Sequence, residues 1–173
     1  TQGLADHAHP PTLSTFPRST PVIGSQSAAK VVEKLGFSNV LALKPGEQTD
    51  FKNLNLKATA GAAVPFTENG YILKHECGSI YIEPHGYLDE KISPQMIDAV
   101  ITPVVNLKLP FFGNFIEGKK VLPDLIKKFR PLTILASTTG GNATFSGLLN
   151  RFISFEGTYD EASSAMQGKT SFI

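Results

Sequence analysis

Several residue types are scarce in this 173-residue chain, and each scarcity excludes a class of protein. Cys77 is the only cysteine, so the chain can form neither an internal disulfide nor a cysteine-based zinc site. Charge is balanced, with 16 Lys and Arg against 15 Asp and Glu, so the basic surface of a nucleic-acid-binding protein is not indicated. No apolar run approaches the ~18 residues of a membrane span, and no signal-peptide pattern is present. We therefore expect a soluble, intracellular protein.

The residues that are present suit one α/β domain. The length is enough for a single core, and 15 Gly and 12 Pro indicate many tight connections. Strand-like and helix-like segments alternate from residue 22 onward, which favours a layered α/β fold. The composition turns small and polar after Glu156, so we expect one domain over residues 1–157 and a mobile tail over 158–173.

Hydrophobic periodicity indicates the individual elements. Apolar residues at helical spacing predict helices over 25–35, 121–129 and 146–153. Ser25 is a suitable N-cap and Gly36 a suitable stop for the first helix, while Pro123 is tolerable only in the first turn of the second. Short apolar or alternating runs predict strands at 21–24, 40–43, 54–59, 71–74, 79–83, 99–102 and 133–136. Because Val100-Ile101 and Ile134-Leu135 do not alternate, we expect fully buried neighbouring strands there.

Two clusters contain side chains that bind metals. Asp6, His7 and His9 fall within four residues of a chain that has only four histidines, and carboxylates and imidazoles are both zinc ligands. The alternative is that Asp6 caps a turn and both histidines lie on the surface. Glu83 and His85 follow a predicted strand, where sites gather in α/β folds. The alternative there is a strand that ends in a proline turn.

Two further segments have weaker signals. Residues 137–142 form a Ser, Thr and Gly-rich loop between a strand and a helix, which could hold an anion but lacks the spacing of a known phosphate motif. Residues 107–116 are strongly apolar. We expect them to form an ordered loop that either packs on the core or offers a contact surface to a protein partner.

The order of the short motifs resembles the metallo-β-lactamase superfamily, in its metallo-hydrolase-like branch of cyanobacteria and plant plastids. The start, Thr1-Gln2-Gly3-Leu4-Ala5-Asp6-His7, is similar to the metal motif T-H-x-H-x-D-H. Further matches follow in family order at residues 58–61, 69–71, 81–85, 100–104 and 145–149. The resemblance implies an αββα sandwich with a site at one edge between two sheets. It also implies that the N-terminal strands of the family domain are missing, so that the sandwich is partial.

The chain departs from this family at most of the metal ligands. The resemblance implies histidines at the positions of Gln2, Leu4, Ala60-Gly61 and Thr138-Thr139, and a bridging aspartate in the Glu83–His85 segment. This chain has none of these ligands at those positions. Asp6 and His7 remain, and His9, Glu83 and His85 are the visible substitutes. Since a two-zinc site needs about three protein ligands for each ion, a standard dinuclear site is not expected.

Two hypotheses follow. In the first, the chain is a hydrolase-like enzyme for an unknown small molecule, with one zinc ion held by Asp6, His7 and His85, His9 nearby, and Asp6 or Glu83 as the base. In the second, it binds no metal and is a catalytically inactive structural or interaction subunit of a larger complex. The contact surface would then include Leu107, Phe111, Phe112 and Phe115. The family resemblance implies residence in the plastid stroma and a photosynthetic complex.

Overall fold

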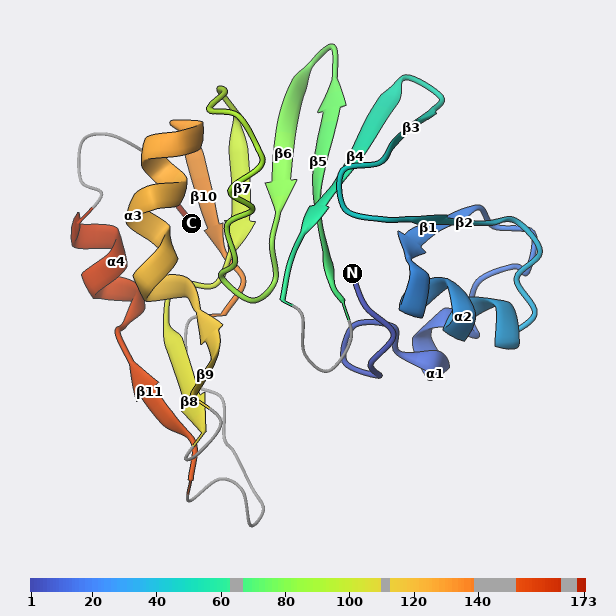
Figure 1. Ribbon diagram of the computed structural model, residues 1–173, viewed down its shortest axis with the longest axis horizontal. Coiled ribbons are helices and arrows are strands. Elements are labelled where there is room, and N and C mark those ends of the chain that lie inside the picture. Colours follow the sequence, from blue (N-terminus) through green and yellow to red (C-terminus); the bar gives the residue numbers. More distant parts are fainter. Residues whose placement is uncertain (63–66, 110–112, 139–151, 166–170) are drawn as a thin grey trace. The chain divides into compact units, whose positions relative to one another are not determined.

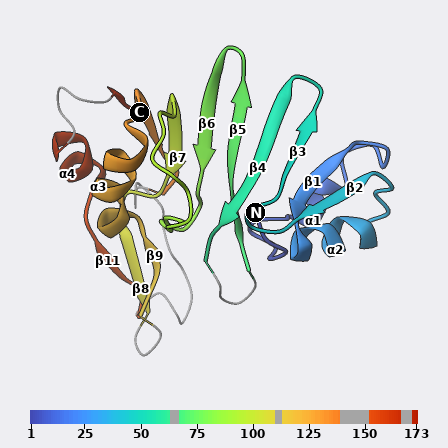
Figure 2. The same cartoon turned by 45° about the horizontal axis from the view of Figure 1, so that its top comes forward.

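The computed structural model describes residues 1–62, 67–109, 113–138, 152–165 and 171–173. The chain divides into two compact units, Thr1–His75 and Glu76–Ile173, whose elements are labelled in Figures 1 and 2. The boundary expected at residue 157 does not coincide with this division. Within the described ranges, no helix is both long enough and apolar enough to cross a membrane.

The first unit contains a parallel strand pair and an antiparallel sheet. Its elements are α1 (Pro10–Leu13), β1 (Val22–Ser25), α2 (Gln26–Lys34), β2 (Val40–Leu43), β3 (Gln48–Phe51), β4 (Leu54–Ala60) and β5 (Asn69–His75). Strands β1 and β2 are parallel, and β3, β4 and β5 follow one another in antiparallel order. The predicted N-cap is confirmed, because the Ser25 hydroxyl accepts the N–H of Ala28. Gly36 follows α2 with a φ of 90°, which suits the end of a helix.

A small core fixes the start of β5. Leu43 of β2, Ala58 of β4 and Tyr71 of β5 are buried together. The Asn69 amide donates hydrogen bonds to the Leu43 carbonyl at 2.8 Å and to the Tyr71 hydroxyl at 3.1 Å, and burial raises the pKa of Tyr71. Because Asn69 is buried and held on both sides, the neighbouring Glu68 has a fixed position.

The second unit contains a parallel sheet and a separate antiparallel sheet. Its elements are β6 (Gly78–Ile82), β7 (Ala99–Thr102), β8 (Asn106–Leu109), β9 (Gly113–Glu117), α3 (Gly118–Phe129), β10 (Thr133–Ala136), β11 (Ser154–Glu156), α4 (Tyr159–Ala165) and β12 (Ser171–Phe172). Strands β6, β7, β10 and β12 lie in that order, all parallel, and β11, β8 and β9 form the antiparallel sheet. Helix α3 packs on β6, with the Phe129 and Tyr81 rings 4.9 Å apart.

The predicted pair of central strands is confirmed. Ile134 lies opposite Val100 and Leu135 lies opposite Ile101 in the parallel ladder between β10 and β7. Val100 and Ile134 are completely buried, whereas Ile101 and Leu135 are only partly buried. The expectation of full burial therefore holds for one residue of each run.

The apolar segment 107–116 is not the ordered loop that the sequence predicts. Strands β8 and β9 pair antiparallel there, with Leu107 opposite Ile116. Both of these side chains are buried, so Leu107 is not part of an exposed contact surface, while Phe115 is 39% exposed. Phe111 and Phe112 lie outside the described residues. The alternation of polar and apolar residues in 106–109 is a strand pattern that the neighbouring proline and glycine obscured.

Two other expectations on helices and the tail differ from the structure. Helix α3 begins at Gly118, so Pro123 lies inside it and not in its first turn. In the segment expected to be mobile, residues 159–165 form α4 and residues 171–172 pair with β10. The Thr158 hydroxyl accepts the N–H of Glu161, which caps α4 as an ordinary N-cap does. Most of the helix predicted over 146–153 falls outside the described residues.

Candidate metal site

His7 is placed by a turn that folds the N-terminal segment back onto α2. The His7 N–H donates to the Leu4 carbonyl at 3.0 Å and closes the turn. Gly3 packs so tightly on α2 that a Cβ there would lie 2.6 Å from the Ser27 carbonyl oxygen, and the Gly3 N–H donates to the Ser27 hydroxyl. Glycine is therefore required beside the turn.

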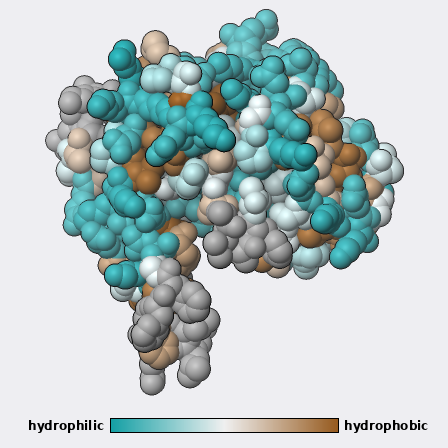
Figure 3. Space-filling view, viewed as in Figure 1, coloured by the Kyte–Doolittle hydropathy of each residue, from teal (hydrophilic) through white to brown (hydrophobic). Residues whose placement is uncertain are grey.

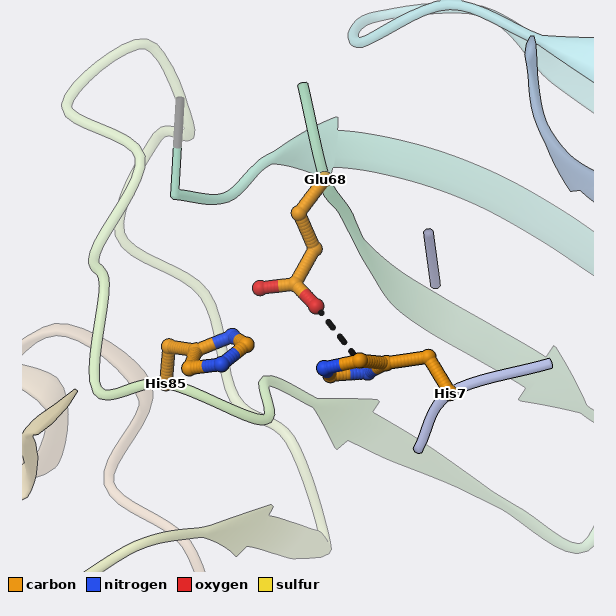
Figure 4. A group of neighbouring side chains, drawn as sticks. All are labelled: His7, Glu68 and His85. Carbon is orange, nitrogen blue, oxygen red and sulfur yellow. Dashed lines mark ion pairs between the residues drawn. The ribbon is translucent and has the colours of Figure 1, made fainter. Parts of the chain in front are cut away.

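Four polar side chains of the first unit surround the His7 ring. On one side, Nδ1 lies 2.8 Å from the Thr1 hydroxyl and 3.4 Å from Glu68 Oε1; Figure 4 marks the Glu68 contact. On the other side, Nε2 lies 3.3 Å from Gln2 Nε2 and 3.5 Å from Asp6 Oδ2. The ring is 11% exposed, so these contacts lie in largely dry surroundings.

Glu68 is the partner that sequence reasoning missed. It is completely buried, and a Cβ at Gly61 would lie 3.1 Å from its Cγ and from its carbonyl oxygen. The missing side chain at position 61, where the resemblance implies a histidine, thus leaves room for Glu68. A signal was available, because Glu68 is the only carboxylate between Asp50 and Glu76 and stands directly before a buried strand.

The arrangement favours one tautomer of His7. A carboxylate beside Nδ1 favours a proton on Nδ1, which leaves the lone pair of Nε2 to bind a metal or to accept from Gln2. Gln2 Oε1 is buried and has no hydrogen-bond partner among the described residues. Zinc can be bound by imidazole nitrogen and by carboxylate or amide oxygen. A zinc-binding histidine usually donates the N–H of its other ring nitrogen to a carboxylate. His7 Nε2, with Asp6 Oδ2 3.5 Å away, therefore has the chemistry of a zinc ligand.

In the second unit, Glu83 holds the loop that carries His85. Its carboxylate is completely buried, and Oε2 accepts the N–H of His85 at 3.1 Å and the N–H of Tyr87 at 2.7 Å. The Glu83 N–H continues the strand by donating to the Ile101 carbonyl. These contacts give Glu83 a structural role in the loop, and its predicted role as a base stays a prediction.

The same loop is held on its other side by the start of α3. The His85 carbonyl accepts the N–H of Glu117 at 2.9 Å. Gly86 has a φ of 75°, and a Cβ there would lie 2.4 Å from the N atom of Gly118. No other residue fits this close approach, so the backbone on both sides of His85 is fixed.

The remaining candidate residues are less involved. His9 is exposed, and its Nδ1 lies 2.7 Å from the Thr12 hydroxyl. In the described part of the chain, no close group of three His, Cys, Asp or Glu side chains includes His9 or Asp6. The structure therefore brings Asp6 to His7 but leaves His9 at the start of α1. Of the possible anion loop, only residues 137 and 138 are described.

Comparison with solved structures identifies the fold. An isothiocyanate hydrolase from Delia radicum gut bacteria aligns with a TM-score of 0.65 and 17% identity, over 99% of this chain and 71% of that one. A candidate metal-dependent hydrolase from Parabacteroides distasonis gives 0.63 and 16%, over 100% and 72%. The metallo-β-lactamase fold protein YhfI from Bacillus subtilis gives 0.57 and 12%, over 88% and 61%. The chain has the metallo-β-lactamase fold. No family model and no curated protein sequence matches it.

The metallo-β-lactamase fold confirms the architecture that the motif order predicts. Identities of 12–17% show a shared fold but not a shared activity. The ligands of this chain must therefore be judged from its own residues.

Proposed function

We propose that the chain is a metallo-β-lactamase-fold hydrolase with a remodelled site for one zinc ion. His7 Nε2 and Asp6 are its ligands in the first unit, and His85 of the second unit is the third, as the family resemblance implies. The observation that supports the proposal best is the buried Glu68 carboxylate beside His7 Nδ1, with Gly61 leaving room for it. A buried carboxylate is costly unless it has such a partner.

Each residue has a distinct task in hydrolysis. When bound, zinc would polarise the substrate and lower the pKa of a water molecule. Glu68 holds the proton on His7 Nδ1 and so keeps Nε2 available. Asp6, whose side chain is 74% exposed, is accessible to water, and the carboxylate oxygen that does not bind the ion is the better candidate to accept a proton. Glu83 is the weaker candidate for the base, because its Oε2 already accepts two backbone N–H groups.

Gln2 and zinc would both bind His7 Nε2, and their binding energies can be compared. A neutral hydrogen bond such as that from Gln2 to His7 contributes about 0.5–1.5 kcal/mol net. A complete structural zinc site contributes about 10–16 kcal/mol. Zinc held by fewer ligands than a complete site would therefore still displace the Gln2 amide from His7. Zinc held by His7 alone would not.

Zinc stoichiometry in single-histidine variants tests the proposal. We expect one zinc per chain in the wild type by elemental analysis after dialysis. His7→Ala and His85→Ala should lose it, while His9→Ala should retain it, because the His9 ring is exposed and its Nδ1 lies beside the Thr12 hydroxyl. Circular dichroism of each variant confirms that it is folded. Zinc in His7→Ala at the wild-type level would exclude this site.

The second candidate function is a catalytically inactive interaction subunit, for which we also propose the plastid complex that the resemblance implies. One observation favours it: Phe115 of β9 and Phe155 of β11 are each about 40% exposed on one small sheet, and Phe152 before β11 is more exposed still. If the wild type binds no zinc and self-associates or binds a protein partner, Phe115→Ser and Phe155→Ser should weaken that association. Association that neither substitution changes would argue against this surface.

A further inference from the structure

A second concave site lies wholly within the second unit, between α3 and α4. These helices are neighbours in both ribbon views (Figures 1 and 2). The pocket has a volume of about 390 Å³, and its apolar wall includes Val104, Leu122, Pro123, Ile126 and Ala162. Figure 3 shows apolar residues at the surface among polar ones over α3. None of these residues belongs to the proposed zinc site.

Pro123 interrupts the hydrogen bonding of α3 beside this apolar wall. It lies inside α3 and has no N–H to donate to the carbonyl of Lys119, four residues earlier. The proline ring also crowds that carbonyl and tends to turn it away from the helix axis. Lys119 and Pro123 both line the pocket. The Lys119 carbonyl therefore lacks its usual helical donor at residue 123, on the stretch of α3 that lines the pocket.

The charges at the pocket do not select an anion. The Lys119 ammonium lies 3.1 Å from Glu161 Oε2 and 4.0 Å from Glu156 Oε1, so two carboxylates already face it. The pair is exposed on both sides and therefore weak, which lets α4 adjust around a ligand. The apolar wall together with this neutralised charge suits an uncharged ligand.

We propose that this pocket binds a neutral small molecule with an apolar body and one hydroxyl or N–H that donates to the Lys119 carbonyl. The volume sets the size of the apolar body. It is more than twice that of the ~150 Å³ cavity that holds benzene, and within the ~300–1,000 Å³ of ordinary ligand pockets. Two fused rings are a suitable body.

Two probes that share the naphthalene rings test the proposal, one with a hydroxyl donor and one whose oxygen carries a methyl group in place of the hydrogen. The full chain is titrated with 2-naphthol and with 2-methoxynaphthalene, and binding is followed by calorimetry. We expect both to bind, and 2-naphthol to bind about 2- to 10-fold more tightly because of its hydrogen bond. Ala162→Phe should abolish binding by filling the pocket, whereas Ser164→Phe, on a residue of α4 that does not line the pocket, should not.

Pro123→Ala isolates the carbonyl. It restores an N–H in α3, so the preference for 2-naphthol should disappear, while the smaller side chain in the pocket wall weakens the binding of both probes alike. The pocket is refuted if neither probe binds the wild type or if a folded Ala162→Phe binds both normally. The role of the Lys119 carbonyl is refuted if Pro123→Ala still binds 2-naphthol more tightly than 2-methoxynaphthalene. This measurement does not depend on Ala162→Phe, so it tests the proposal even if that variant does not fold.

Discussion

Replacing Glu83 by alanine tests how the structure holds the His85 loop. The substitution leaves the N–H groups of His85 and Tyr87 without their acceptor Oε2. Each buried donor left unsatisfied costs about 1–3 kcal/mol. Tyr87 is 42% exposed, so water can replace part of the loss, and removing a buried charge returns some desolvation energy. We therefore expect a loss of about 2–4 kcal/mol in the free energy of unfolding.

Urea denaturation measures this loss, and amide hydrogen exchange locates it. Glu83→Ala should increase exchange at residues 85 and 87 far more than in the strands β7 and β10. Glu90→Ala is the matched control, because this neighbouring glutamate is exposed, and it should change stability by less than about 0.5 kcal/mol. If Glu83→Ala is as stable as the Glu90 variant, the carboxylate does not hold the loop.

Three further predictions concern single sites. Gln2→His should strengthen zinc binding by at least about 10-fold, because it returns an imidazole to a position 3.3 Å from a ligand nitrogen; unchanged affinity in a zinc titration argues against it. Gly61→Ala should destabilise the chain by about 1–3 kcal/mol in urea, since its Cβ would press on Glu68, and no loss would contradict that packing. Hydrogen bonds from Ser79 lower the pKa of Asp98, so this stabilisation is present above about pH 4 and is lost as the pH falls through the lowered pKa. In Ser79→Ala the Asp98 pKa, followed by NMR, should rise, and an unchanged value would refute the assignment.

Much of the fold was predictable because local patterns agree with their surroundings. The cap at Ser25 and the paired runs around Val100 and Ile134 follow from short-range chemistry and from hydrophobic burial. Helix α4 and strand β12 were not predictable in the same way, because a polar segment was read as a tail. Strand β12 forms by pairing with β10, which is distant in sequence. Such long-range pairing leaves little trace in local composition.

The candidate site was predictable only in part. The motif order pointed to Asp6 and His7, and the structure places Asp6 Oδ2 3.5 Å from His7 Nε2, while their role as zinc ligands stays a prediction. Glu68 was missed since its role depends on the empty space at Gly61, which only the folded backbone reveals. His9 is a residue type that suits a metal, but its Nδ1 lies 2.7 Å from the Thr12 hydroxyl, so its role as a ligand stays a prediction.

A zinc titration of the wild type beside Glu68→Gln tests the central proposal most directly. If Glu68 keeps the proton on His7 Nδ1, the wild type should bind one zinc per chain, and Glu68→Gln should bind it about 10- to 100-fold more weakly. Both proteins should remain folded by circular dichroism. A wild type that binds no stoichiometric zinc would contradict the proposed hydrolase, and equal affinity in the two proteins would contradict the role of Glu68.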